Sequence, residues 1–268
     1  MRCVNILTRA IKLLGLCSAA LLSGSAYAQS VTPEKTSADY LLMVFMKPLP
    51  ERQAEYFKWY QGQHMGEVLE RPGFVTARIY KAVNADFLPG NDHPNPVLIK
   101  YGIRTDNITE TFSIDSQLSQ AARLADPPLD AKATQSFTYE KTGEEINGKG
   151  ARSVGTGALK TYEFFVLSSA KATRDAEVNA WYGAQIKELS TIPGVVSAQR
   201  YQRSAVQRYS GAQSPTYMVV YGIVTNDLQT VFRDLSKSLQ KIGVSDAVDD
   251  SANKVFVYEA LGPLMERK

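Results

Sequence analysis

Hydrophobic positions in this chain form short apolar runs that alternate with stretches of helical spacing. Residues 40–46 are a continuous apolar run, which is typical of a strand covered on both faces. Over residues 51–71, apolar side chains recur at spacings of three and four, as they do along one face of a helix. A Pro-Gly pair at 72–73 ends this helix, and the alternating run 74–80 predicts a second strand. The first predicted unit therefore opens strand–helix–strand.

The same kinds of pattern continue along the chain and predict two rounds of one element order. The remaining predicted elements are strands at 97–105, 135–140, 162–167, 195–201, 217–225 and 255–259, and helices at 108–125, 175–191 and 228–242. Each round has the order βαββαβ, which is the ferredoxin-like plan.

Matching residues indicate that the two rounds are copies of one unit. Residues 101–105 read Tyr-Gly-Ile-Arg-Thr, and residues 221–225 read Tyr-Gly-Ile-Val-Thr. Residues 137–140 and 256–259 read Phe-Thr-Tyr-Glu and Phe-Val-Tyr-Glu. The offsets between matching residues lie between 119 and 122, which is the signature of an internal repeat.

A repeat of this kind suggests how the chain buries its apolar surface. A four-stranded sheet with two helices on one face leaves its other face apolar, and a second such sheet can cover it. We therefore predict an α+β fold in which two tandem ferredoxin-like units, residues 39–141 and 159–262, close one α/β barrel. The Gly-rich stretch 142–158 has no apolar period and predicts a flexible linker.

Residues 1–28 have the pattern of a secretory signal peptide. Three basic residues precede the apolar run 13–22, and Ala26-Tyr27-Ala28 forms a small-x-small cleavage site. The apolar run is too short for a stable membrane anchor. We therefore expect cleavage after Ala28 and a periplasmic or secreted protein, with no membrane partner once the signal is removed.

Removal of the signal also changes the charge and the cysteine chemistry. The whole chain has 30 Lys and Arg against 27 Asp and Glu, and residues 1–28 hold three of the basic ones, so 27 remain against 27. A balanced charge gives no support to nucleic acid as a partner. Cys3 and Cys17 both lie in the signal, so we expect neither disulfides nor cysteine-ligated metal in the mature protein.

The sequence Trp59-Tyr60-x3-His64-x7-Pro72-Gly73-Phe74, placed after an apolar strand, resembles the EthD-like branch of the dimeric α/β-barrel superfamily. The resemblance covers residues 39–141 and 159–262. It implies a fold shared by cofactor-free monooxygenases, polyketide cyclases, muconolactone-type isomerases, aldoxime dehydratases and haem enzymes such as chlorite dismutase. In cofactor-free members a helix histidine often points into a cavity between helices and sheet, and that role carries over to His64 alone.

The second copy departs from this pattern. Aligning Trp59 with Trp181 puts Ile186 where His64 stands, and the second helix is one residue shorter before Pro193. We therefore predict an active first unit and a degenerate, structural second unit.

His64 and Tyr60 are the predicted catalytic residues. Tyr56, Tyr60 and His64 are spaced four apart and share one helix face with apolar neighbours. A partly buried imidazole near neutral pKa can act as general acid or base, and a tyrosine hydroxyl can orient it or polarise a carbonyl. The alternative is a histidine at the edge of the core that is satisfied by a backbone carbonyl.

Predicted substrate contacts come from the strands and from the same helix. The aromatic candidates have aromatic counterparts in the second copy, which favours packing as the alternative role. Arg78 and Arg104 have Gln199 and Val224 as counterparts, so either arginine could hold a carboxylate, with a surface position as the alternative. The predicted substrate-binding residues are Tyr40, Trp59, Arg78, Tyr80, Tyr101 and Tyr139.

These features predict an exported enzyme that performs cofactor-independent acid–base chemistry, of the isomerase, cyclase, lyase or monooxygenase-like type, on a small hydrophobic or aromatic compound. We expect a monomer or weak homo-oligomer. No metal is expected, because Asp92-His93 is weak as a metal site. The alternatives are a non-catalytic periplasmic carrier of apolar ligands and a haem protein. Haem is disfavoured because two-unit haem members place the proximal histidine in the second unit, and both histidines here lie in the first.

Overall fold

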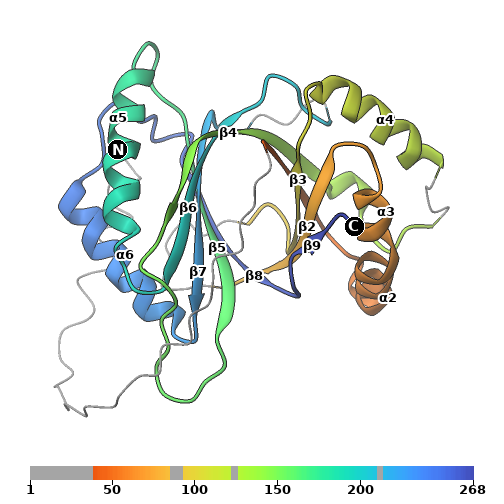
Figure 1. Ribbon diagram of the computed structural model, residues 1–268, viewed down its shortest axis with the longest axis horizontal. Helices are drawn as coiled ribbons and strands as arrows, with labels where there is room; N and C mark the ends of the chain where they lie inside the picture. Colours follow the sequence, from red (N-terminus) through yellow and green to blue (C-terminus); the bar gives the residue numbers. More distant parts are fainter. Residues whose placement is uncertain (1–38, 85–92, 122–125, 210–213) are drawn as a thin grey trace.

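A computed structural model describes residues 39–84, 93–121, 126–209 and 214–268. The predicted signal peptide, its cleavage site and Asp92 lie outside these residues. The described chain is an α+β structure built around an eight-stranded antiparallel barrel (Figure 1). The strands are β1 (Tyr40–Met46), β2 (Phe74–Ala82), β3 (Val97–Ile103), β4 (Gln135–Asn147), β5 (Lys160–Ser168), β6 (Val195–Arg203), β7 (Tyr217–Thr225) and β8 (Lys254–Ala260), with a short β9 (Met265–Glu266) beside β2.

Helices cover the barrel on two opposite sides. The first side carries α2 (Gln53–Trp59), α3 (Met65–Leu69) and α4 (Ile108–Ala121), and the other carries α5 (Asp175–Leu189) and α6 (Leu228–Ile242) (Figure 1). Short 3₁₀ turns lie at Pro50–Arg52 and Ala131–Ala133. No helix among the described residues is long and apolar enough to cross a membrane.

The two halves of the chain place their strands in the same order. In space the barrel runs β3-β1-β4-β6-β7-β5-β8-β2, and β2 pairs with β3 to close it. The first half thus contributes β2-β3-β1-β4 and the second β6-β7-β5-β8. The seams pair β4 with β6 and β8 with β2, so the last strand of each half joins the second strand of the other.

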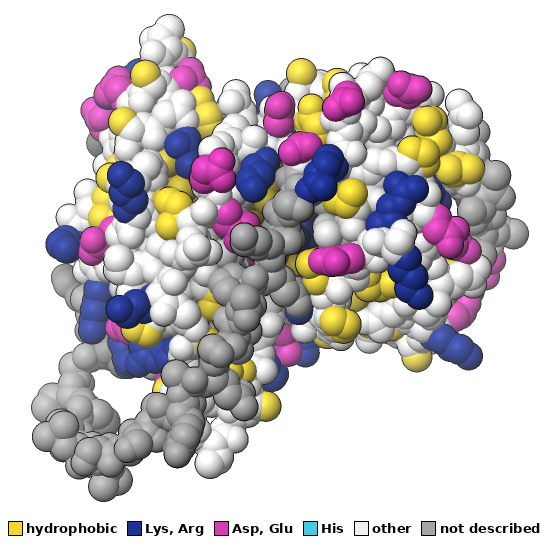
Figure 2. Space-filling model, viewed as in Figure 1, with side chains coloured by type: hydrophobic (Ala, Val, Ile, Leu, Met, Phe, Trp, Pro, Cys, Tyr) yellow, Lys and Arg dark blue, Asp and Glu magenta, His cyan; other side chains and the backbone are white. Residues whose placement is uncertain are grey.

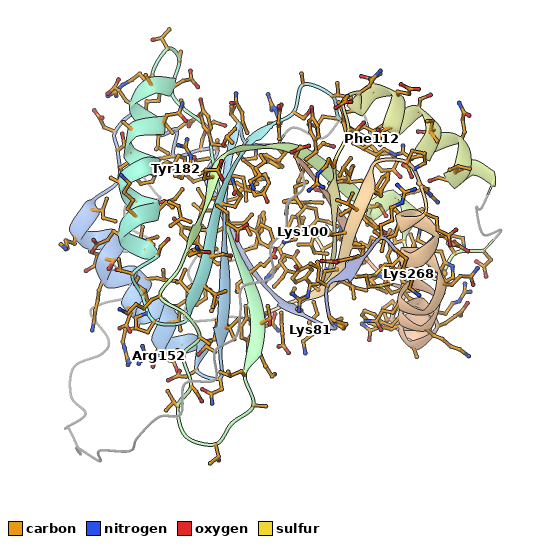
Figure 3. The ribbon with its side chains drawn as sticks, in the orientation of Figure 1. Lys81, Lys100, Phe112, Arg152, Tyr182 and Lys268 are labelled. Atoms are coloured by element: carbon orange, nitrogen blue, oxygen red, sulfur yellow. The ribbon has the colours of Figure 1, made fainter. Side chains whose placement is uncertain are left out.

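Alternation along the strands separates three apolar cores. One core lies between α2, α3 and α4 and the outer face of the first half's strands, and a second lies in the same place in the second half. The third fills the inside of the barrel with largely aromatic side chains, among them Phe45, Tyr80, Tyr139, Phe165 and Tyr258. Figure 3 shows Tyr182 and Phe112 under the helices of opposite sides, with Lys100 between them.

The predicted linker is shorter and better ordered than its composition suggests. β4 continues to Asn147, so residues 142–147 are strand and pair with β6 across a bulge. The Lys149 amide then bonds to the Ser190 carbonyl at 2.8 Å. A Cβ on Gly148 would lie 2.2 Å from the Val195 oxygen, so glycine is required by this close approach rather than by flexibility.

Charges of both signs are interspersed over the described surface on the face shown in Figure 2. His93, four residues before β3, bonds through Nε2 to the Val257 carbonyl at 2.9 Å. Its ring also meets the edge of Tyr258 at 5.0 Å. These contacts give His93 a packing role against the second half.

Candidate functional site

The helix that carries the predicted catalytic residues changes its winding at that point. Between α2 and α3 the chain forms a π-turn, Tyr60–His64, in which the Met65 amide donates to the Tyr60 carbonyl five residues earlier. A π-turn is one extra residue inside an α-helix, and such turns are frequent at functional sites. The matching helix of the second half, α5, is a regular α-helix.

This π-turn accounts for the difference in helix length between the two halves of the chain. Pro72 follows Trp59 by thirteen residues, whereas Pro193 follows Trp181 by twelve. The extra residue of the first half is the one that the π-turn takes up. A sequence alignment that starts from the tryptophans therefore goes out of register beyond it.

With the π-turn included, His64 has a different counterpart. Matching residues of the two halves differ by 122 in number before the π-turn and by 121 after it. This pairs buried Met65 with buried Ile186. His64 is then paired with Gln185, which is 2% exposed. The prediction that Ile186 takes the place of His64 is wrong, because a single inserted residue moves every following position by one. Both halves therefore carry a polar side chain at this place.

His64 is held by aromatic rings and one carboxylate. Its ring stacks on Trp59 with centroids 4.7 Å apart and meets the edge of Tyr60 at 5.0 Å. Nδ1 lies 3.3 Å from Glu67 Oε2, one turn further along the helix. The side chain is 19% exposed, so the imidazole is half-buried with one edge open to solvent.

The surroundings of His64 favour the neutral ring. Burial, which penalises the imidazolium, lowers the pKa of His64 below its ordinary value, and Arg71 lowers it further. The hydrogen bond to Glu67 acts in the opposite direction without reversing the shift in pKa. His64 is therefore an unprotonated base at neutral pH.

Tyr60, whose ring contacts His64, also belongs to a pair of tyrosine hydroxyls. The hydroxyls of Tyr60, on the π-turn, and Tyr101, on β3, are 2.9 Å apart, and both side chains are buried. Burial raises the pKa of both phenols, so both remain protonated at neutral pH. One hydroxyl donates to the other, and the accepting hydroxyl keeps its own proton available for a third group.

Charged residues that sequence reasoning missed lie next to this cluster. Arg71 Nη1 bonds to Asp115 on α4 and, at 2.7 Å, to Ser119 Oγ. The second oxygen of Asp115 accepts from Arg208 Nε, which comes from the loop between β6 and β7. The matching positions in the second half are apolar, and that contrast is the sequence signal that could have revealed the network.

Four of the predicted site residues come together in one layer. Trp59, Tyr60, His64 and Tyr101 lie between the first half's helices and sheet. Tyr40, at the start of β1, packs against the same core from a partly buried position. This group is the candidate site.

Two further tyrosines lie on the opposite face of the sheet, inside the barrel. Tyr80 donates to Glu163 Oε1 at 2.8 Å, and Tyr139 donates to the Pro215 carbonyl at 3.0 Å. Glu163 also forms an ion pair with Lys100. The structure does not bring Tyr80 and Tyr139 to the cluster around His64.

The two predicted arginines have different surroundings. Arg78 is 8% exposed, and its Nε donates to the Gly262 carbonyl at 2.9 Å. Its counterpart Gln199 donates to the Gly143 carbonyl at 3.4 Å, at the matching bulge of the other seam. Arg78 is therefore buried and bonds to a seam, and the surface alternative is wrong for it. Arg104 is exposed at the end of β3.

A cavity of about 270 Å³ lies in the second half, between α5 and the strands β4, β6 and β7. Arg200 reaches toward it and bonds to the Asn179 side chain. The Tyr217 hydroxyl donates to Asp175, and burial followed by this bond raises the pKa of Tyr217 to about 12. The cavity is lined by Thr142, Gly143, Glu144, Ile146, Asn179, Ile186, Ala198, Arg200, Gln202 and Tyr217.

In the first half the matching space is filled by apolar side chains. Where the second half has Asn179, Arg200 and Tyr217, the first half has Phe57, Ile79 and Val97. All three pack into the first half's core. The half that carries His64 and the half that carries this cavity are therefore different.

No family model matches the chain, and no curated protein matches it. Solved structures with the same architecture do match. One, an anthrone oxidase-like protein, has a TM-score of 0.51 at 10% identity over 87% of this chain and 95% of that one. Another, a chlorite dismutase from Candidatus Nitrospira defluvii in complex with cyanide, has a TM-score of 0.51 at 11% identity over 84% and 92%. The fold is that of the dimeric α/β barrels.

Haem, one of the alternatives that the sequence left open, does not fit the residues around the cavity. Haem iron is held by His, Cys, Met or Tyr side chains. Tyr217 is the one such residue in the cavity lining, and its hydroxyl is engaged with Asp175. Within the described ranges there is also no cluster of three or more His, Cys, Asp or Glu side chains suited to a metal ion.

Proposed function

We propose that this protein is an exported enzyme that performs cofactor-independent acid–base chemistry on a small hydrophobic or aromatic compound, with His64 as the proton-transferring group. The observation that carries the proposal is the π-turn, which sets a neutral imidazole against the ring of Tyr60, a protonated tyrosine that is bonded to a second one, Tyr101. Two tandem ferredoxin-like units of the EthD-like branch would provide the scaffold. Cleavage after Ala28 would release the mature protein as a monomer or weak homo-oligomer.

Glu67 assigns the tautomer that this chemistry needs. Its carboxylate faces Nδ1, so Nδ1 carries the proton and donates, and Nε2 keeps a free electron pair. Nε2 can then remove a proton from a carbon next to a carbonyl group. Glu67 thus acts as a positioning residue, as a carboxylate does for histidine in other acid–base sites.

The electron pair released by that step moves to the carbonyl oxygen of the substrate. A protonated Tyr60 or Tyr101 hydroxyl can donate to the resulting oxyanion. The proton on Nε2 then returns to a different carbon, which is an isomerisation, or a leaving group departs, which is an elimination. Trp59 stacks on the face of the His64 ring and offers an aromatic surface beside it.

A second candidate is a carrier that binds a small molecule without converting it. The cavity in the second half favours this reading, because it lies away from His64 and is lined by polar as well as apolar groups. A carrier would keep its ligand affinity in His64 variants and lose it when Arg200 is changed.

Deuterium exchange tests the proposal without a known substrate. A panel of small aromatic ketones and unsaturated lactones would be incubated with the protein in D₂O, and exchange of the carbon-bound hydrogens would be followed by NMR. We expect His64→Gln to fold, because Gln185 occupies the matching place, and to lower the exchange rate by about 10²–10⁴. Exchange that is equal in wild type and His64→Gln would refute the assignment. Arg200→Met is the matched control and should exchange at the wild-type rate.

A further inference from the structure

Arg71, Asp115 and Arg208 form a charge network that the proposed proton transfer does not use. The two guanidinium groups share the one carboxylate, each bonded to a different oxygen. Their side chains are nearly buried, with 6% of Arg71, 6% of Asp115 and 7% of Arg208 exposed. The network joins the end of the catalytic helix, α4, and a loop from the other half of the chain.

The network carries one positive charge more than it neutralises. Among the residues that the structure describes, Asp115 is the single carboxylate that pairs with either arginine. Arg71 uses Nη1 for both of its bonds, and Arg208 uses Nε alone, so the remaining guanidinium N–H groups make no bond within the described chain. None of these nitrogens is among the described buried side-chain atoms that lack a partner, so they reach solvent, where an anion can accept from them.

The second half shows that the fold does not need these charges. Where the first half has Arg71, Asp115 and Ser119, the second half has Ile192, Leu235 and Leu239, which pack into its apolar core. Replacing buried ions by apolar residues of similar size is often neutral or stabilising. Packing therefore does not explain the charges of Arg71 and Asp115, which occur only in the half that carries His64.

The network reaches from the tyrosine pair to the surface. Arg71 lies two residues after α3, at the end of the helix that carries His64, and the charges of Arg71 and Asp115 act on the pKa values of Tyr60 and His64. At the other end, the Arg208 guanidinium lies 4.5 Å from the centre of the Tyr209 ring, and that ring is 50% exposed. A cationic group beside an exposed aromatic face is suited to an aromatic acid.

We propose that this network selects small aromatic or unsaturated carboxylates as ligands of the His64 site. The ligand's carboxylate accepts from the unused guanidinium donors and neutralises the excess charge, and its ring packs on Tyr209. The inference rests on the proposed function, since it names the substrate class of the same site.

Benzoate and benzamide are the probes for this proposal, because they differ in charge but hardly in shape. Binding to the full-length mature protein would be measured by calorimetry and by NMR shifts of the His64 ring. We expect wild type to bind benzoate about tenfold more tightly than benzamide, the effect of one charge-assisted bond. Equal affinity for the two probes, or binding of neither, would overturn the proposal.

Variants that change the network's charge sharpen the test. Arg208→Met leaves a balanced Arg71–Asp115 pair, so it should fold and lose the preference for benzoate. Asp115→Asn leaves two unpaired guanidinium groups and should increase the preference. Arg152→Met removes a paired arginine in the second half and is the matched control, with an unchanged preference. A preference that persists in Arg208→Met would contradict the assignment.

These measurements separate the two proposals. Should the benzoate preference follow the network's charge while His64→Gln leaves hydrogen exchange unchanged, the anion site stands and the catalytic role of His64 falls. If substrate hydrogen exchange depends on His64 but benzoate and benzamide bind equally well, the catalytic role of His64 stands and the anion site falls. If the network only ties the halves together, Arg208→Met will lower the unfolding temperature and leave the ratio of the two affinities as it was.

Discussion

The two halves of this barrel are built on the same strand order but use equivalent positions for different purposes. The first half has a π-turn, His64 and the network around Asp115, and its helix–sheet space is otherwise packed. The second half has a regular α5, an apolar core at the network positions and a polar cavity. Each half therefore serves as an internal control for the other. Positions that stay apolar in both are needed by the fold, and positions that turn polar in one half are candidates for function.

Inside the barrel the contrast is a single ion pair between the halves. Lys100 on β3 and Glu163 on β5 are paired at 8% and 12% side-chain exposure, and their counterparts are Val220 and Leu41. We expect Glu163→Leu to lower the free energy of unfolding by about 3–5 kcal/mol, because it leaves Lys100 buried without its partner. Urea denaturation measures this loss.

The double variant Lys100→Val, Glu163→Leu gives both halves the apolar version of this layer. Its unfolding free energy should exceed that of Glu163→Leu, since no unpaired charge remains. The loss of unfolding free energy in the double variant would be compared with the sum of the losses in Lys100→Val and Glu163→Leu. If the two values are equal, the two residues are not coupled and the ion pair does not distinguish the halves.

The next largest effect concerns the π-turn, which distinguishes the two helices. Deletion of Gly62 removes the extra residue and should convert Gln53–Leu69 into a regular helix like α5. The fold should persist, because the second half has such a helix at the same place. The rate at which the protein exchanges the substrate's carbon-bound hydrogens should fall by about 10²-fold, which is the effect of displacing a catalytic group by roughly 1 Å. Circular dichroism would confirm the fold, and an active deletion variant would show that the π-turn is dispensable.

The fold was accessible from the sequence because it depends on periodicity. Apolar runs and helical spacings fixed the element order, and the repeated Tyr-Gly-Ile of β3 and β7 reflects matching strands in the two halves. The predicted linker failed because a glycine at 148 reads as flexibility, whereas here it allows a strand to lie against Val195. Glycine composition alone cannot distinguish these two causes.

The site was only partly accessible. Trp59, Tyr60 and His64 lie close together because they share one helix, and Tyr101 joins them from a strand. Arg71, Asp115 and Arg208 come from three distant segments, and nothing in their local sequence indicates that they meet. The one-residue insertion at the π-turn also concealed Gln185 as the counterpart of His64. The pattern of residues along the chain shows neither which distant segments come into contact nor where a helix contains a π-turn.

A smaller effect is expected at the glycine that follows the first helix of each half. Gly73 and Gly194 have φ values of 86° and 104°, a region that other residues enter at a cost of about 1–2 kcal/mol. A Cβ at Gly194 would lie 2.6 Å from Val231 Cγ2, whereas at Gly73 the nearest atom, Thr111 Cγ2, would be 3.0 Å away. Gly194→Ala should therefore destabilise the protein more than Gly73→Ala in thermal unfolding. The reverse order would show that the first half is packed more tightly at this turn.

The smallest expected effect is a pH dependence of stability that belongs to the first half alone. Burial lowers the pKa of His64 in the folded protein, so between its folded and unfolded pKa values the unfolded chain binds more protons. The contribution of His64 to stability is complete above its unfolded pKa of about 6.5 and is lost as the pH falls toward the folded value. Glu67 and Asp115 oppose the shift in the pKa of His64, and Arg71 reinforces it, so the size of the shift reports the local charge.

Unfolding free energies measured from pH 8 to pH 5 should show a slope in wild type that is reduced in His64→Gln. Gln185→Glu in the second half offers the converse case, because a carboxyl buried at the matching place would gain a raised pKa and lose stability as the pH rises. Identical slopes in wild type and His64→Gln would mean that the imidazole is as well solvated in the folded protein as in the unfolded chain, and the case for a neutral base at this site would fail.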